Sequence, residues 1–227
     1  MLFPRLSGGL VASLNRQAFT FHGIVPVPDD LVELSQLKRA MLFELAVARA
    51  ERILAGQNDT DWNRCIQIAT ERQSRHYDAK VPAEVSQIDI DVAEHAGQNL
   101  VEMLRSIREQ NPGAELEIGP VIPGLGWIAS GNGDFALGNI LIEVKHTDRN
   151  FVSGDFRQVL MYWILKYAGS IERDVDVWSD CLLLNPRRNS ALHVNFDKLL
   201  YSASASSNRV ELCELLRSIV SQDLERR

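Results

Sequence analysis

Three charged side chains interrupt a short and otherwise mostly apolar stretch of the sequence, GDFALGNILIEVKH at residues 133–146. They are Asp134, Glu143 and Lys145. Mg²⁺ prefers one or two carboxylates as ligands and keeps its other positions for water and phosphate oxygens. An ammonium group in the same space can orient an attacking water or stabilise the charge that develops on a phosphate. These residue types therefore predict metal-assisted chemistry on a phosphate ester, provided that the chain brings them together.

A strand around residues 140–145 would place two of these charges on one face. Side chains alternate between the two faces of a strand, so Glu143 and Lys145 share a face with Leu141. The opposite face is wholly apolar and consists of Ile140, Ile142 and Val144. We therefore expect one face of this strand to be core and the other to carry the chemistry.

A tight turn would bring the third charge to the same place. The pair Gly138-Asn139 favours a two-residue hairpin, in which the flanking residues pair with each other. Counting outward from that turn places Asp134 directly opposite Glu143, with their Cβ atoms roughly 5 Å apart. Two like charges at this distance destabilise a sheet unless one is protonated or a cation lies between them. A divalent cation is the simplest solution.

The elements that must hold this hairpin can be predicted from hydrophobic periodicity. Apolar residues recur at three- and four-residue spacing in five segments, which predicts helices at residues 29–56, 61–75, 89–113, 155–169 and 208–227. Strand-like runs outside the hairpin lie at residues 114–130, 176–185 and 191–196. The first 26 residues alternate only weakly and indicate short strands or an extended arm.

The order of these elements predicts an α/β fold. From about residue 90 the order is α-β-β-β-α-β-β, which indicates a mixed central sheet flanked by helices. Residues 1–88 are then an N-terminal, mostly helical subdomain, and residues 89–227 form the domain that carries the hairpin.

Composition narrows the class of protein. The chain has 227 residues, 45% of them hydrophobic and 24% charged, which is typical of a globular protein with a substantial core. Its net charge of −6 argues against broad, non-specific binding of nucleic acid. The sequence contains no 18-residue apolar run and no secretory signal pattern, so we expect no membrane association and a cytoplasmic location. Three widely spaced cysteines predict neither a disulfide framework nor a zinc site.

Asp134, followed by Glu143-Val144-Lys145 on a hairpin after a helix, resembles the PD-(D/E)xK nuclease superfamily. The resemblance covers roughly residues 90–200, and Gly133 stands where the family often has proline. Gln158 and Tyr162 add the Gln-x-x-x-Tyr spacing that is found in part of the superfamily. The resemblance implies a restriction-endonuclease-like αβββαβ core and metal-dependent hydrolysis of phosphodiester bonds.

The resemblance also implies roles for individual residues. Asp134 and Glu143 would hold Mg²⁺, for which Mn²⁺ would substitute, and Lys145 would assist the attacking water. Gln158 would lie beside the metal site, and Tyr162 would pack near the substrate strand.

The family often adds an acidic residue on the helix before the sheet. Glu94 and Glu102 compete for that position. Glu94 lies nearer the apolar face of the predicted helix, so it is favoured as a third metal ligand.

Each of these residues also has an interpretation that needs no catalysis. Glu143 and Lys145 could form an ordinary ion pair on an exposed sheet. Gln158 could complete a capping box with Asp155 at the start of its helix. Tyr162 could simply be core, because its helix is apolar on nearly every side.

The motifs taken together predict a Mg²⁺-dependent deoxyribonuclease, with prokaryotic anti-phage or genome defence as its setting by family analogy. DNA is then the substrate, and the acidic net charge predicts a partner subunit or a homo-oligomer that helps to hold it. The alternative is a catalytically silent nuclease fold that acts in DNA binding or complex assembly, with the helical N-terminal part as a docking surface.

Overall fold

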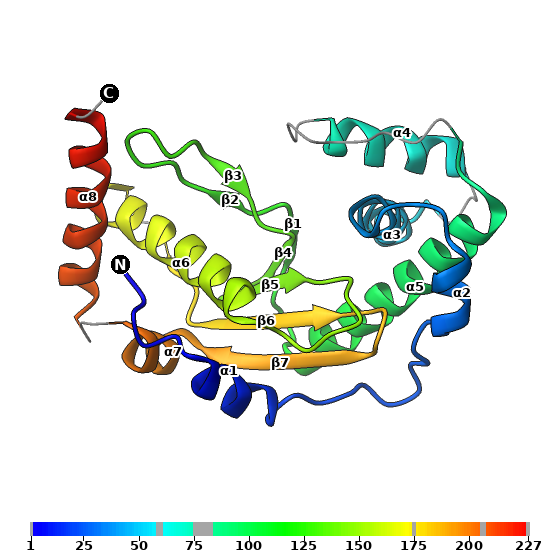
Figure 1. Cartoon of the computed structure of the whole chain (residues 1–227), viewed down its shortest axis with the longest axis horizontal. Helices are drawn as coiled ribbons and strands as arrows, with labels where there is room; N and C mark the ends of the chain where they lie inside the picture. Colours follow the sequence, from blue (N-terminus) through cyan, green and yellow to red (C-terminus); the bar gives the residue numbers. More distant parts are fainter. Residues whose placement is uncertain (1, 58–60, 75–83, 174–175, 205–207, 226–227) are drawn as a thin grey trace.

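A computed structural model describes residues 2–57, 61–74, 84–173, 176–204 and 208–225 of the chain. The fold is a mixed α/β arrangement in which helices flank a central sheet (Figure 1). The helices are α1 (Gly8–Asn15), α2 (Asp29–Leu34), α3 (Arg39–Leu54), α4 (Trp62–Gln73), α5 (Gln87–Gln110), α6 (Ser153–Arg173), α7 (Phe196–Ala203) and α8 (Arg209–Glu225). The strands are β1 (Leu116–Ile118), β2 (Val121–Ile122), β3 (Gly131–Asn132), β4 (Phe135–Leu137), β5 (Ile140–Val144), β6 (Asp180–Asn185) and β7 (Ser190–Asn195).

The central sheet has five strands in the order β1-β4-β5-β6-β7. The β5–β6 pair is parallel and the other three pairs are antiparallel. Helix α6 makes the crossover that a parallel pair requires. Strands β2 and β3 lie between β1 and β4 in the sequence and form a separate two-stranded ribbon. The mixed central sheet flanked by helices that the sequence predicts is thus confirmed.

Helices α5 and α6 cover opposite faces of the sheet (Figure 1). On the α5 face, Ile142 and Val144 of β5 pack with Leu100 and Leu104 of the helix. On the α6 face, a second cluster joins Leu141 to apolar side chains of α6, among them Phe156, Leu160 and Trp163. The expectation that only one face would be core was therefore wrong, because the face that carries Glu143 is also covered.

The predicted helix at residues 29–56 is interrupted in the structure. Helix α2 ends at Leu34, and α3 begins only at Arg39. The buried carboxylate of Asp89 binds the intervening segment: it accepts hydrogen bonds from the Ser35 hydroxyl at 2.5 Å and from the Gln36 amide at 3.2 Å. These hydrogen bonds to Asp89 take the place of helical backbone hydrogen bonds in this segment. Hydrophobic periodicity cannot predict the interruption, because it depends on a residue far away in the sequence.

Two short helices depart from the sequence-based expectations. Residues 8–15 form α1 rather than a strand or an extended arm, with the Ser7 hydroxyl accepting from the Leu10 amide at its start. Helix α7 directly follows β7 and was not predicted, although Asn195 caps it in the same way, through the amide of Lys198. Helix α7 has only eight residues and begins directly after a strand. Its apolar residues therefore repeat too few times to indicate a helix from the sequence.

The N-terminal part contributes to both sides of the sheet. Phe3 and Val11 join the cluster on the α6 face, while Phe21 and Val47 join the cluster on the α5 face. Phe19 also forms a β-bridge with Ala191. The division into residues 1–88 and 89–227 stays a prediction.

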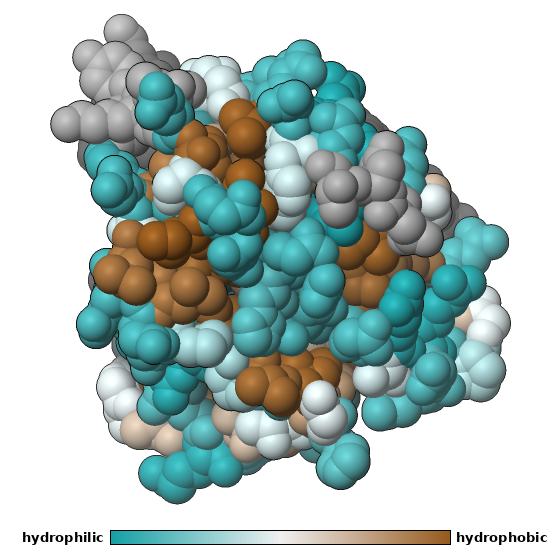
Figure 2. All heavy atoms as spheres, turned by 90° about the vertical axis from the view of Figure 1, so that its right-hand side faces the viewer, coloured by the Kyte–Doolittle hydropathy of each residue, from teal (hydrophilic) through white to brown (hydrophobic). Residues whose placement is uncertain are grey.

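The surface on the α2 and α4 side is mostly hydrophilic, with separate hydrophobic patches between the polar side chains (Figure 2). No helix in the described part of the chain is long and apolar enough to cross a membrane. The three cysteines are free and buried, so they contribute to packing.

Candidate active site

The predicted hairpin is present with the predicted register. Leu137 pairs with Ile140, and Phe135 pairs with Ile142. Gly138 occupies the left-handed region at φ +55°, which glycine adopts without strain. Continuing this register by one residue on each strand sets Asp134 opposite Glu143, as expected.

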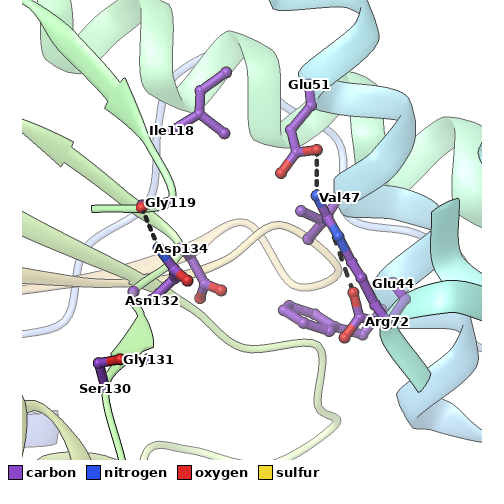
Figure 3. Close-up of a pocket in the computed structure, with 12 residues that line it drawn as sticks. Glu44, Val47, Glu51, Arg72, Ile118, Gly119, Ser130, Gly131, Asn132 and Asp134 are labelled. Carbon is purple, nitrogen blue, oxygen red and sulfur yellow. Dashed lines mark hydrogen bonds and ion pairs between the residues drawn. The ribbon is translucent and has the colours of Figure 1, made fainter. Parts of the chain in front are cut away.

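Asp134 directly precedes β4 and is half-buried. Its Oδ2 accepts a hydrogen bond of 2.7 Å from the amide of Val144. The carboxylate faces a cleft that it helps to line (Figure 3). The Val144 amide thus fixes Oδ2 of Asp134 at the open end of the β4–β5 hairpin.

Glu143 is almost fully buried, with 3% of its surface exposed. Its Oε1 accepts a hydrogen bond of 2.7 Å from Nζ of Lys145. Its Oε2 is buried and has no hydrogen-bond partner. A buried carboxylate oxygen without a donor is costly, because it loses its hydration and receives nothing in return.

A chain of side-chain hydrogen bonds continues from Glu143 across to α6. Nζ of Lys145 also donates to Oε1 of Gln158 at 2.8 Å, and Nε2 of Gln158 donates to the hydroxyl of Tyr162 at 2.8 Å. The structure therefore connects all four residues, Glu143, Lys145, Gln158 and Tyr162, in one network. This network is partly buried rather than an ion pair on an exposed sheet.

The alternative role of Gln158 as a capping residue is not seen. Asp155 itself makes the capping contact, accepting from the Val152 amide at 2.8 Å, and it also binds Arg149. Both ends of the Gln158 amide are engaged with Lys145 and Tyr162 instead.

The electrostatics of the site follow from burial and from like charge. Burial raises the pKa of Asp134 well above its usual value, and the Glu143 carboxylate raises it further. Burial also raises the pKa of Glu143, and Lys145 only partly offsets this. For Lys145 burial acts to lower the pKa, but the carboxylates of Glu143 and Asp134 outweigh it, so the pKa is raised and the ammonium stays charged. Lys145 is thus ion-paired with Glu143 and acts on Asp134 through its charge alone.

The cleft in front of Asp134 has a volume of about 710 Å³. One wall runs from Ile118 through the segment 130–134, and the other is formed by α3 and α4. On that second wall Arg72 of α4 binds two carboxylates of α3, Glu51 at 2.7 Å and Glu44 at 3.8 Å (Figure 3). Sequence reasoning did not find these three residues, because charged side chains on amphipathic helices are ordinary and nothing local marks them as facing a strand.

Glu94, the expected third ligand, is not brought to Asp134 and Glu143. It forms a two-point ion pair with Arg49 of α3, in which Nε donates to Oε2 at 2.7 Å and Nη2 donates to Oε1 at 3.2 Å. Gln98 also donates to Oε1, at 2.7 Å. The competing residue Glu102 pairs with Arg105 on the exposed side of α5. The contacts of Glu94 correct the expectation: they join α3 to α5 and are structural.

A divalent cation still fits the two remaining carboxylates. No group of three or more acidic, histidine or cysteine ligands exists among the described residues. Mg²⁺ does not need three, because it takes one or two carboxylates and completes its shell with water and substrate oxygens. The partnerless Oε2 of Glu143 and the raised pKa values of both carboxylates are what a site completed by a cation would show.

Comparison of the chain with protein-family models, with curated proteins and with solved structures gives no significant match.

Proposed function

We propose that this chain is a Mg²⁺-dependent nuclease that hydrolyses phosphodiester bonds of DNA. The observation that carries the proposal is the partnerless, buried Oε2 of Glu143, opposite Asp134 and beside Lys145. A carboxylate pair that only stabilised a sheet would have its oxygens satisfied, as buried polar groups generally do.

The order of elements supports a restriction-endonuclease-like core. Setting aside the β2–β3 ribbon, the chain runs α5, β1, β4, β5, α6, β6, which is the αβββαβ order of the PD-(D/E)xK superfamily. Asp134 directly precedes the second of those strands, Glu143 lies on the third, and Gln158 and Tyr162 lie on the next helix. A cytoplasmic location and a role in prokaryotic defence belong to the proposal by family analogy.

The residues divide the chemistry between them. Asp134 and Glu143 would hold the cation, which neutralises charge on the phosphate and lowers the pKa of water. The Val144 amide fixes the orientation of Asp134. Lys145 stays protonated and uses two of its three N–H donors on Glu143 and Gln158, so its ammonium is oriented before the substrate arrives.

Hydrolysis then requires an in-line attack on phosphorus. A water oxygen forms the new bond to phosphorus while the bond to the sugar oxygen of the leaving strand breaks. The water gives up one proton, and the leaving oxygen gains one from solvent. Lys145 stabilises the negative charge that develops on the phosphate during this exchange.

A cleavage assay tests the proposal. Purified protein is incubated with linear, circular, methylated and single-stranded DNA, with RNA included for comparison, in Mg²⁺ or Mn²⁺. We expect cleavage of DNA that EDTA stops and that Asp134→Asn and Lys145→Ala abolish, in proteins whose circular dichroism spectra match that of the parent. Absence of cleavage of every substrate, with either metal, would overturn the proposal. Intact DNA binding in that case would favour the catalytically silent alternative.

A further inference from the structure

The loop that connects β5 to α6, residues 145–152, begins at the candidate active site and has arginine side chains around it. Its first residue is Lys145, and Arg149 follows four residues later. Arg188, from the turn between β6 and β7, binds the middle of the loop, where its Nη1 donates to the Asp148 carbonyl at 3.0 Å. We propose that this β5–α6 loop binds the phosphate backbone of DNA, with Arg149 and Arg188 each contacting one phosphate. This inference rests on the proposed function for the identity of the ligand.

Side chains hold the backbone of the β5–α6 loop in one conformation. Five consecutive carbonyl groups, those of residues 147–151, each accept a hydrogen bond of 2.8 to 3.0 Å from a side chain. Some of these donors come from distant elements, such as Asn185 at the end of β6 and Asn15 at the end of α1. A loop that is already fixed loses little conformational entropy when it binds a ligand.

Arg149 and Arg188 keep hydrogen-bond donors available for a ligand. A guanidinium has five N–H donors on three nitrogens. Within the described part of the chain, Arg149 uses only Nη1, which donates to the Asn150 carbonyl and to Oδ2 of Asp155, each at 3.0 Å. Arg188 likewise uses only Nη1, and both side chains are exposed. Nε and Nη2 of each can therefore make the two-point contact that suits a phosphate.

The arginines around the loop are not all neutralised. Arg39, Arg149 and Arg187 each have one carboxylate partner, whereas Arg188 binds an uncharged carbonyl and has no carboxylate partner among the described residues. The loop therefore has excess positive charge, although the chain as a whole carries −6. A local excess of this sign attracts a polyanion to this surface.

Two neighbouring groups respond to this positive charge. For Asp148 burial acts to raise the pKa, but its own backbone amide and the guanidiniums of Arg39 and Arg187 outweigh it, so the pKa is lowered. Burial lowers the pKa of His146 to about 4, and the same two arginines act in that direction. Both effects favour the form of the group that carries less positive charge, as a nearby cation requires.

The β5–α6 loop is close enough to the candidate active site to contact the same DNA strand. Four residues of extended chain span at most about 14 Å, which limits the backbone distance from Lys145 to Arg149. Phosphates of one strand follow each other every 3.4 Å or so along the helix axis, so this distance corresponds to about four nucleotides. Burial is the main cause that raises the pKa of Glu143, and the charge of Asp155, the partner of Arg149, adds to it. The loop and the carboxylates of the site thus interact.

Substitutions of the two arginines, each with a matched control, test this surface. Arg149→Gln and Arg188→Gln remove the charge but keep an amide that can donate to the loop carbonyls. Arg105→Gln is the control for Arg149, because Arg105 is an exposed arginine in an ion pair on α5. Arg64→Gln is the control for Arg188, because Arg64 is exposed on α4 and bonded to an uncharged side chain. Binding of a DNA duplex and of one of its strands is measured in EDTA at a series of salt concentrations.

We expect each loop variant to reduce the slope of log K against log salt by about 0.9 for the duplex and about 0.7 for the single strand, the contribution of one phosphate contact. A slope contribution of 0.9 amounts to about eightfold in affinity at 0.1 M salt relative to 1 M. Arg149→Lys and Arg188→Lys, which keep the charge, should retain the slope of the parent, as should both controls. In Mn²⁺ the loop variants should need more DNA for half-maximal cleavage, with a rate at saturating DNA within about threefold of the parent.

The outcomes distinguish this inference from the proposed nuclease. A lower melting temperature of Arg149→Gln and Arg188→Gln with an unchanged salt slope would make both arginines structural and overturn the inference, while cleavage would still support the nuclease. Equal slope changes in the loop variants and the controls would also overturn it, as would a parent that binds no DNA at 50 mM salt. Binding that depends on the two loop arginines, without cleavage of any substrate, would support the phosphate-binding surface and overturn the nuclease.

Discussion

The ion pairs Glu94–Arg49 and Glu143–Lys145 are both partly buried, and they differ in how completely the carboxylate oxygens are hydrogen-bonded. At the α3–α5 interface, both oxygens of Glu94 accept hydrogen bonds, from Arg49 and from Gln98. On β5, Glu143 accepts from Lys145 at one oxygen and has no partner at the other. The Glu94–Arg49 pair joins two helices, whereas Glu143 and Lys145 lie on one strand segment. Only the second pair leaves an acceptor unused and has a second carboxylate, Asp134, opposite it.

The difference separates a structural pair from a reactive one. A complete set of hydrogen bonds offsets the cost of burying Glu94 and rigidifies the helix interface. The incomplete hydrogen bonding of Glu143 and the like charge of Asp134 opposite it destabilise the fold. Binding of a proton or a cation between the two carboxylates would remove this destabilisation. Strain of this kind is retained where it serves binding or catalysis.

The largest expected contrast comes from the same substitution in both pairs. Glu143→Gln should lower the rate of DNA cleavage by at least about 100-fold, because a neutral amide binds the cation more weakly than the carboxylate does. Glu94→Gln should leave the cleavage rate of the folded protein within about twofold of the parent. Its effect should be a loss of roughly 2 kcal/mol in the free energy of unfolding, from weakened charged hydrogen bonds to Arg49. Cleavage rates and urea unfolding of the two variants make the comparison.

An equal loss of cleavage in both variants would mean that Glu94 acts on the site through the α3–α5 interface, and the distinction between the pairs would not hold.

The glutamines that support the two pairs provide a second contrast. Gln158 binds Lys145, and Gln98 binds Glu94. Gln158→Ala should lower cleavage about 10- to 100-fold, as loss of a residue that orients a catalytic group does, with a smaller change in stability. Gln98→Ala, at an exposed position, should change cleavage by less than twofold. If Gln158→Ala reduced stability by about 1 kcal/mol and left cleavage unchanged, Gln158 would be a structural residue like Gln98.

The response to metal gives a third contrast. A cation that binds only the folded protein stabilises it by about 1.4 kcal/mol at ten times its dissociation constant. For a chain of this length that corresponds to a rise of about 3–6 °C in melting temperature. Mn²⁺ should produce this rise in the parent and in Glu94→Gln, but hardly at all in Asp134→Asn. Without metal, Asp134→Asn should be as stable as the parent or more stable by up to about 1 kcal/mol, since it removes a like-charge pair. A parent that is indifferent to Mn²⁺ would exclude the metal site.

The smallest effect concerns pH. Asp134 and Glu143 have raised pKa values in the folded protein, so the folded state binds protons more tightly than the unfolded state. Their contribution to stability is then fully present below the usual carboxyl pKa and is lost as pH rises through the raised one. Buried His146 acts in the opposite direction, because burial lowers its pKa to about 4 and stability falls as pH drops toward that value.

A difference between variants isolates the carboxylate pair, because His146 contributes equally to both. The stability of Asp134→Asn minus that of the parent, without metal, should increase as pH rises from the ordinary carboxyl range toward neutrality. Chemical unfolding at a series of pH values measures this difference. A difference that stays constant with pH would show that the two carboxylates do not repel each other in the fold.

Local sequence was sufficient for much of the candidate site. The alternation of Leu141, Glu143 and Lys145 and the turn at Gly138 fixed which residues face each other, because strand period and turn length leave a hairpin little choice of register. The spacing of Gln158 and Tyr162 placed both on one face of α6. These features depend on neighbours within a few residues along the chain or across one turn.

The remaining features were decided by contacts between segments far apart in sequence. Asp89 interrupts a periodic helix because its buried carboxylate binds Ser35, 54 residues away. Glu94 is a structural residue because Arg49 packs beside it, and Arg72 faces Asp134 only because α4 lies across the cleft from the sheet. Periodicity reports which side of an element is apolar, but it carries no information on which charged group of another element will satisfy a buried carboxylate. Only the packed structure distinguishes the acid that is satisfied, Glu94, from the one that is not, Glu143.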